Sequence, residues 1–234
     1  MIDITYIVFV LPAVIFAMIA SARVDSVFEK YSKQLVRGYT AAQVARRILD
    51  DNGLYHIRIE RVSGKLTDHY DPKNDVIRLS DSVYGSSSTA AIGVAAHECG
   101  HAIQHATGYL PIKIRSAIVP ITNIGSKLAM PLILIGCVFA YAGEFFVIVA
   151  YVGAACFGLS TLFQLVTLPT EFNASRRALA TIEEDGILHG DELTGARRVL
   201  SAAAMTYVAA LAVSIMQLIR LLIIIGGNRN NRRR

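Results

Sequence analysis

The sequence predicts a predominantly helical membrane protein of the α+β class, with about four transmembrane helices and a small antiparallel sheet. Of its 234 residues, 53% are hydrophobic and only 18% are charged, whereas about a quarter of the residues in a soluble domain are charged. The apolar residues form long uncharged blocks instead of recurring at the spacing of a soluble core. A segment of ordinary soluble composition separates the first block from the second.

The net charge of +5 does not indicate a nucleic-acid-binding protein. No zinc-finger or RNA-recognition signature accompanies it, so we expect no nucleic-acid partner and assign the charge to the flanks of membrane spans. Of the three cysteines, Cys137 and Cys156 lie inside apolar blocks, and Cys99 has no companion at zinc-ribbon spacing. The sequence therefore predicts neither a disulfide framework nor a cysteine metal ligand.

Membrane spans are predicted where charge is absent over about 20 residues, the helical length that crosses about 30 Å of hydrocarbon. The first block has no Lys or Arg before it, which favours a retained anchor over a cleaved signal peptide. Arg220 interrupts the last block close to its end, where its side chain can reach the headgroups. The predicted segments are an anchor (4–22), the first part of a catalytic domain (23–116), a transmembrane hairpin (117–170), the second part of that domain (171–198), a fourth transmembrane or membrane-embedded helix (199–225) and a disordered basic tail (226–234).

Signals of local structure are clear within 23–116. Thr40 and Gln43 form a capping-box pair before a helix that should stop at Asn52 and Gly53. Alternating apolar residues predict strands over 56–62 and 75–80, with turns between them. The second strand is either part of a core sheet or an edge strand along which an extended substrate could add.

An Ala-rich helix is predicted over 90–107, and it carries the H-E-x-x-H pattern from His97 to His101. Residues four apart on a helix differ by about 40° in direction and about 6 Å in height, so the two imidazoles converge and Glu98 projects beside them. The pattern is typical of a zinc site with an adjacent general base. The structural alternative is a pair of buried histidines, whose desolvation nothing would offset.

A catalytic zinc takes three protein ligands, so the sequence must supply a third. His105 shares the helix face but lies about 12 Å along the axis from the first histidine. Glu144 sits at the tip of the membrane hairpin, on the opposite side of the membrane. Glu171 follows Pro169, where we expect a new helix to begin on the same side as the histidines, and it is favoured. The alternatives are the acidic residues near the following turn, namely Glu183, Glu184, Asp185, Asp191 and Glu192.

These residues predict metal-assisted hydrolysis in which Glu98 takes a proton from water and passes it to the leaving group. The sequence nominates several side chains to stabilise the oxyanion, namely His189, Tyr84, Arg176 and Arg177. Two other functions stay open: a non-catalytic membrane zinc protein that acts as a scaffold, and a zinc hydrolase of a lipid or small amide. Structural zinc sites are usually closed by a fourth Cys or His, which favours catalysis here.

The stretch from His97 to His105, the later stretch from Glu171 to Ser175 and the apolar hairpin between them resemble the YugP-like family of bacterial membrane zinc metallopeptidases. The chain is more distantly similar to HtpX-type and CAAX-prenyl proteases, which are gluzincins. The resemblance implies a zincin-like catalytic helix, a Zn²⁺ cofactor, a peptide or membrane-protein substrate and a location in the bacterial inner membrane. It also implies that His97, His101 and Glu171 are the zinc ligands and Glu98 the general base. Ser175 stands where the distant relatives usually have Asp, four residues after the ligand Glu.

With all zinc ligands on one side and four spans, both termini are expected on the other side. More basic residues flank the spans on the catalytic side, which predicts that this side is cytoplasmic. The arginines of the tail argue the other way, or indicate that the last apolar block lies shallowly or re-enters the membrane. The basic residues counted on the catalytic side are Arg23, Lys30, Lys33, Arg37, Lys113, Arg115, Lys127, Arg176, Arg177, Arg197 and Arg198, and those opposite are Arg220, Arg229, Arg232, Arg233 and Arg234.

Overall fold

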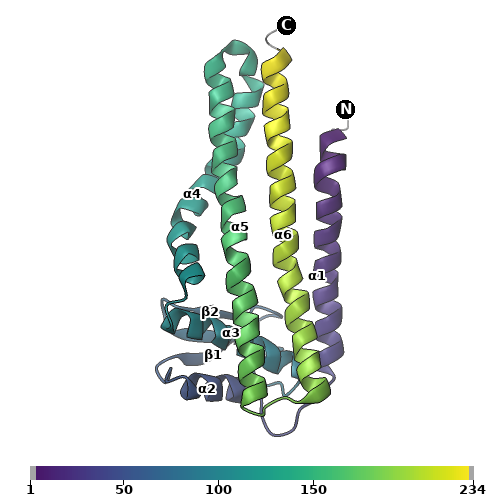
Figure 1. Ribbon diagram of the computed structural model, residues 1–234, viewed down its shortest axis with the longest axis vertical. Helices are drawn as coiled ribbons and strands as arrows, with labels where there is room; N and C mark the ends of the chain where they lie inside the picture. Colours follow the sequence, from purple (N-terminus) through teal and green to yellow (C-terminus); the bar gives the residue numbers. More distant parts are fainter. Residues whose placement is uncertain (1–3, 232–234) are drawn as a thin grey trace. The chain divides into compact units, whose positions relative to one another are not determined.

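The computed structural model describes residues 4–231 and is mainly helical (Figure 1). The chain divides into two compact units. The long-helix unit comprises 1–19, 114–168 and 206–234, and the α/β unit comprises 20–113 and 169–205. In chain order the elements are η1 (Tyr6–Val10, a π-helix), α1 (Leu11–Ser32), α2 (Ala41–Asp51), β1 (Arg58–Val62), β2 (His69–Asp71), β3 (Val76–Ser80), α3 (Thr89–Ala106), α4 (Leu110–Val138), η2 (Ala140–Ala142, a 3₁₀ turn), α5 (Glu144–Glu184) and α6 (Gly190–Asn231).

Four helices of the described chain are long and apolar enough to cross a membrane. They are Tyr6–Ser32, Leu110–Val138, Glu144–Glu184 and Gly190–Gly227. Large apolar side chains such as Met18, Leu134 and Phe145 are exposed on them, which suits a lipid environment and not water. The predicted fold class, a helical membrane α+β protein with about four spans, is confirmed, whereas the division into six segments stays a prediction.

Two predicted helix boundaries are wrong. No new helix begins after Pro169, because α5 continues through it as one element of 41 residues. A proline removes one backbone hydrogen bond, and a long apolar helix can continue through it where neighbouring groups or a local adjustment of the helix satisfy the freed carbonyl. Helix α6 is likewise unbroken from Gly190 to Asn231, which excludes a re-entrant turn. Residues 226–231 of the supposedly disordered tail are therefore helical, and 232–234 lie outside the described residues.

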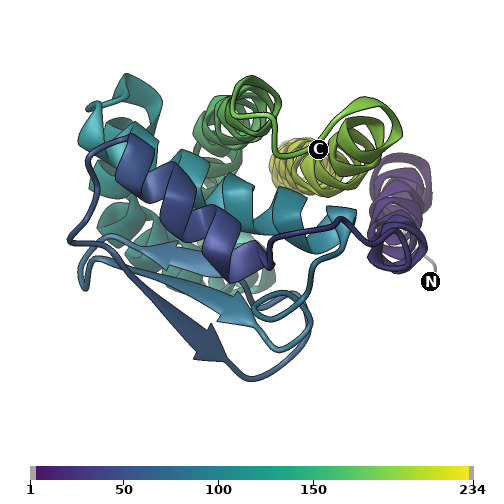
Figure 2. The ribbon, with the colours of Figure 1, turned by 90° about the horizontal axis from the view of Figure 1, so that it is seen from below.

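The local signals in the α/β unit are confirmed. The Thr40 hydroxyl accepts a hydrogen bond from the backbone N–H of Gln43, whose side chain accepts one from the backbone N–H of Thr40. Helix α2 ends at Asp51 with Asn52 as its C-cap, and Gly53 follows with φ +71°, a conformation that favours glycine. Ser88 caps α3 by accepting from the N–H of Ala91. Helices α2 and α3 pack on each other, with the sheet along their side (Figure 2).

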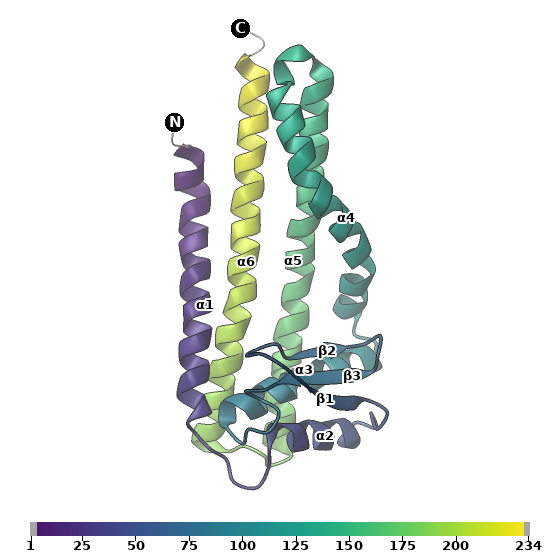
Figure 3. The same ribbon diagram turned by 180° about the vertical axis from the view of Figure 1, so that it is seen from behind.

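The sheet is mixed, which corrects the prediction that it is antiparallel. Its strand order is β1-β3-β2, with β1 parallel and β2 antiparallel to β3 (Figure 3). Strand β2 was not predicted, because its three residues are polar and carry no alternation. It forms a hairpin with β3 through the predicted turn after Asp71, which leaves β1 to pair with the other edge of β3. Of the two alternatives for 75–80, the core strand is therefore confirmed and the edge strand is excluded, since β3 is central and β2 is an edge.

Candidate metal centre

The α/β unit brings together the side chains of His97 and His101 from α3 and Glu171 from α5. The Oε2 atom of Glu171 lies 3.3 Å from Nε2 of His97 and 3.4 Å from Nε2 of His101. The imidazole rings are nearly perpendicular, with centroids 4.7 Å apart. Glu171 is only 2% exposed. The three ligand atoms thus face one point, although 69 residues separate the second histidine from the glutamate in the sequence.

The separations between these atoms fit a zinc ion. Tetrahedral ligands at about 2.0–2.1 Å from zinc lie about 3.3–3.4 Å from one another. A direct charge-assisted hydrogen bond between an imidazole and a carboxylate would be shorter, about 2.7–2.9 Å. Two nitrogens and one carboxylate oxygen are also a donor set that zinc takes in catalytic sites. The metal-ligand group found among the described residues has three members, which leaves a fourth coordination position open.

Each histidine is oriented through its other ring nitrogen. The Nδ1 atom of His97 lies 3.1 Å from the hydroxyl of Ser175, and Nδ1 of His101 lies 3.0 Å from Oε1 of Gln104. When each Nδ1–H donates to its oxygen, each Nε2 presents its lone pair to the metal position. Ser175 therefore takes the place of the carboxylate that the distant relatives usually have here.

Gln104 was not predicted to belong to the site. Its side chain is fully buried, and its amide nitrogen donates to the carbonyl of Thr170 and to Oδ1 of Asn173 at 2.8 and 3.0 Å. It therefore links His101 on α3 to the backbone of α5 beside Glu171. Its position one turn after His101, on the same helix face, was the available signal, but its partners lie more than 60 residues away in the sequence.

Gly100 lets the two helices approach. A Cβ atom at this position would lie 2.6 Å from the carbonyl oxygen of Ala174, which is closer than real Cβ contacts allow. Ala174 is one helical turn after Glu171, so this contact sets how near the carboxylate comes to the histidines. The glycine inside the H-E-x-x-H pattern is thus the point where α3 and α5 touch.

Nearby negative charge favours the protonated form of His101. Burial of His101 opposes its charged form, but the hydrogen bond with Glu171 and the negative charges of Glu98 and Glu171 outweigh it and raise the pKa of His101. Before metal binding the site therefore favours a proton where a cation would sit. This preference is what a site built for a positive ion should show.

Glu98 is 8% exposed, and within 4–231 its carboxylate has no hydrogen-bond partner. Its oxygens are therefore available for proton transfer. The neighbouring Cys99 points away from the metal position, with its Sγ donating to the carbonyl of Ala45 on α2. Burial raises the pKa of this thiol, which suits the expected role as core filler.

Other residues singled out from the sequence lie outside the ligand group. The ring of His105 packs edge-on against Tyr70, 5.5 Å between centroids. Glu183 and Glu184 lie 12 and 13 residues after Glu171 on α5, which is about 18–20 Å at 1.5 Å per residue. Asp185 and His189 follow the end of α5, and Asp191 and Glu192 begin α6. Of the oxyanion candidates, Arg177 is the nearest to the network, because its Nε donates to Asn173 at 2.8 Å. Arg176 is exposed, and Tyr84 packs against the α/β core.

The chain was compared with known proteins. Residues 6–226 match the model of a family described as "Putative neutral zinc metallopeptidase". The chain is 47% identical over 206 residues to "Putative membrane protease YugP" of Bacillus subtilis (strain 168), which covers 88% of this chain and 89% of that protein. No solved structure matches the chain. The family and the relative together confirm the resemblance seen in the sequence and the zinc cofactor that it implied. The chain belongs to this family of neutral zinc metallopeptidases.

Proposed function

We propose that the chain is an integral-membrane zinc metalloprotease in which His97, His101 and Glu171 hold the metal and Glu98 is the general base. The observation that carries the proposal is the convergence of three ligand atoms at separations of 3.3 and 3.4 Å, with Glu98 adjacent to the first histidine. A bound zinc ion would act as a Lewis acid toward the scissile carbonyl and acidify the attacking water.

The side chains then have distinct tasks. Glu98 accepts a proton from the attacking water and delivers it to the leaving amine. Ser175 and Gln104 hold His97 and His101 in the tautomer that leaves Nε2 free. Arg177 is the candidate to stabilise the oxyanion, because Asn173 holds its guanidinium next to the Gln104 network.

An edge strand of the sheet could bind an extended peptide substrate. We assign this role to β2, which pairs only with β3 and whose Tyr70 touches His105 on the catalytic helix. An extended peptide can hydrogen-bond the free edge of such a strand, so its backbone is recognised whatever its side chains are. This arrangement favours a peptide substrate over a lipid or small amide, and the open metal position favours catalysis over a scaffold role.

The decisive experiment measures zinc content and cleavage in the purified protein. Wild type should contain about one zinc ion per chain and cleave an unfolded membrane-protein substrate. Glu98→Gln should keep the zinc and lose about 10²–10⁴-fold in activity, as expected for a general base. His97→Ala should lose both. Glu183→Gln, an exposed acid at the far end of α5, serves as the matched control. Undiminished cleavage by Glu98→Gln refutes the proposal, and cleavage of lipids instead of peptides would refute the substrate class.

We further propose that the protein is a multi-pass protein of the cell membrane with its catalytic side in the cytoplasm. The larger number of basic residues beside the spans on that side supports this orientation. Both chain ends then face outward. A C-terminal alkaline phosphatase fusion, active only outside the cytoplasm, should be active, and a C-terminal green fluorescent protein fusion dark. The reverse pattern would invert the topology.

A further inference from the structure

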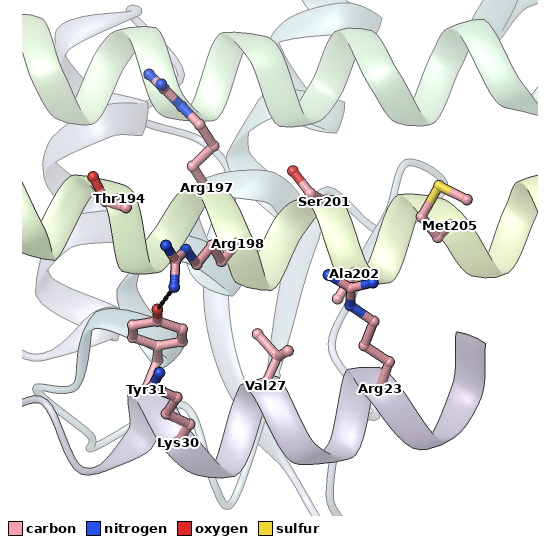
Figure 4. A pocket seen from close by; sticks show the side chains of 10 residues that line it. All are labelled: Arg23, Val27, Lys30, Tyr31, Thr194, Arg197, Arg198, Ser201, Ala202 and Met205. Atoms are coloured by element: carbon pink, nitrogen blue, oxygen red, sulfur yellow. Dashed lines mark hydrogen bonds between the residues drawn. The ribbon is translucent and has the colours of Figure 1, made fainter. Parts of the chain in front are cut away.

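A basic groove lies between α1 and α6 within the α/β unit, with a cavity volume of about 650 Å³. Three of its cationic side chains, Arg23 and Lys30 from α1 and Arg198 from α6, border the space between the two helices (Figure 4). Arg197 also lines the cavity, but its side chain leans away from α1. The guanidinium of Arg198 donates to the hydroxyl of Tyr31 at 3.1 Å.

These cations have no acidic partners. Within 4–231 neither Arg23, Lys30 nor Arg198 forms an ion pair with a carboxylate. The acidic residues of the same stretch of α1 are engaged elsewhere, since Glu29 pairs with Lys33 and Asp25 pairs with Lys65. Asp191 is the acid among the residues that line the smaller adjoining cavity. The groove therefore carries a net positive charge that an anion would neutralise.

The groove lies where the predicted spans meet the aqueous side. Arg23 is the first charge after the uncharged block 4–22, and Arg198 is the last before the uncharged block that starts at Val199. One end of the groove is thus at the level of the headgroups. Apolar residues line the same cavity, namely Val27 on α1 and Ala202 and Met205 on α6, and the side chain of Arg23 reaches toward Ala202 (Figure 4). Met205 leads into the predicted fourth span. Cations mixed with apolar residues at the edge of the predicted spans match a phospholipid, which joins a charged headgroup to apolar chains, and not a free ion.

A buried hydrogen-bond acceptor near the groove indicates that the ligand carries a hydroxyl group. Gln34 lines the adjoining cavity, and its Oε1 atom is buried without a hydrogen-bond partner among the described residues. An unsatisfied buried acceptor costs free energy, which a hydroxyl donor on a ligand would recover. A glycerol headgroup offers such a hydroxyl beside its phosphate.

We propose that the groove binds an anionic phospholipid with a hydroxylated headgroup, of the phosphatidylglycerol type. Arg23, Lys30 and Arg198 contact the phosphate, which arginine can bind with two parallel hydrogen bonds. An acyl chain lies along Ala202 and Met205. The groove is also connected to the catalytic helix, because α6 packs on α3 where a Cβ on Gly93 would lie 3.3 Å from Cβ of Ala196.

Native mass spectrometry of the detergent-purified chain tests the site independently of zinc or activity. Dioleoylphosphatidylglycerol should remain bound to wild type, and dioleoylphosphatidylcholine should not. The variant R23Q/R198Q should bind the anionic lipid roughly tenfold more weakly, because each basic residue near an anionic lipid adds appreciably to affinity. R37Q/K73Q, which removes two exposed charges outside the groove, is the matched control and should bind within about twofold of wild type.

Two further variants separate the contribution of the apolar residues from that of the charges. Met205→Trp should fill the apolar part of the groove and weaken lipid binding without changing any charge, whereas R23K/R198K should retain most of it. Circular dichroism should show that every variant keeps its helix content. Equal lipid binding by wild type and R23Q/R198Q overturns the site. Binding of inorganic phosphate in the groove, with no preference for the anionic lipid over the zwitterionic one, overturns the lipid assignment.

Discussion

The two units bury different kinds of polar group. In the α/β unit the described buried side chains include two carboxylates and an amide, those of Glu98, Glu171 and Gln104. In the described part of the long-helix unit the buried polar side chains are hydroxyls, such as those of Thr167 and Ser214. A hydroxyl is satisfied cheaply, and Thr167 donates to a carbonyl of its own helix. A buried carboxylate needs a cation or several donors. The comparison locates the chemistry in the α/β unit.

Metal removal should separate the two units most strongly. The α/β unit gathers a carboxylate and two imidazoles that a bound zinc ion would hold together, so chelation should lower its stability by about 4 kcal/mol relative to protein with free zinc at 1,000 times Kd. The long-helix unit contains no such group within its described residues and should keep its helices. Thermal unfolding followed by circular dichroism, with and without a chelator, measures this difference. His97→Ala should unfold identically in both conditions, and a chelator effect on that variant would contradict the assignment.

Two glycines at close helix contacts sharpen the comparison. Gly100→Ala in the α/β unit would press on the carbonyl of Ala174 and should cost roughly 1–3 kcal/mol, because helices at such contacts cannot move without loss of packing. It should also weaken zinc binding at least about tenfold, since the displaced helix carries Glu171. Gly136→Ala in the long-helix unit would press on Ala150 and should cost a similar free energy while zinc affinity stays unchanged.

Zinc titration with a competing chelator, together with thermal unfolding, distinguishes these outcomes. Gly158→Ala is the control, because a Cβ there meets no atom within 4 Å and alanine is the better helix former. Zinc binding that is unchanged in Gly100→Ala would show that the contact between α3 and α5 does not set the ligand geometry.

The same comparison explains what the sequence could and could not predict. Patterns within one element were sufficient for the spans, for the cap at Thr40 and for the histidine pair. A span depends on one uninterrupted apolar block of about 20 residues. The cap and the histidine pair depend on neighbours at most four residues apart. Glu171 could be predicted as the third ligand, because two membrane crossings between it and the histidines return the chain to the same side. Gln104 and Gly100 could not, because their partners on α5 become neighbours only when the two helices pack.

The errors in the sheet have a related cause. A strand of three polar residues such as β2 carries no alternation, and the choice between parallel and antiparallel pairing belongs to the folded sheet, not to either strand. The prediction that a helix ends at Pro169 was wrong. Whether one lost backbone hydrogen bond ends a helix depends on the groups that surround the proline in the folded protein.

Gln104 acts on the site through a hydrogen bond and not through a helix contact, so its substitution should change zinc affinity more than folding stability. Gln104→Leu removes the acceptor for His101 and should lower zinc affinity about 10–100-fold, the usual range for a residue that orients a metal ligand. Gln104→Glu keeps an acceptor for His101 but places a carboxylate oxygen against the carbonyl of Thr170. It should therefore retain more of the zinc affinity while lowering thermal stability. If both variants bind zinc like wild type, the hydrogen bond does not position the histidine.

The smallest expected effect concerns charge in the hairpin of the α/β unit. Burial raises the pKa of Asp68 above its ordinary value of 3.8, although the N–H and hydroxyl of Ser80 both donate to it and partly oppose the shift. A raised pKa in the folded state means that Asp68 contributes stability below pH 3.8, and that this contribution is lost as the pH rises through the folded pKa. In Asp68→Asn the amide oxygen can accept from the N–H of Ser80 and the amide nitrogen can donate to the Ser80 hydroxyl, so both contacts can persist without the charge.

Asp68→Asn should therefore gain stability relative to wild type between about pH 4 and pH 7, by about 1 kcal/mol or less. Asp71→Asn should instead be less stable than wild type throughout this range, with a difference that does not change with pH. Hydrogen bonds from Asn74 and Arg78 lower the pKa of Asp71, so its contribution is fully present above pH 3.8 and is lost only as the pH falls below that value. Melting temperatures of both variants and wild type, measured across this range in one detergent, give the two differences with any histidine titration cancelled. Parallel slopes for the two variants would show that burial does not govern Asp68.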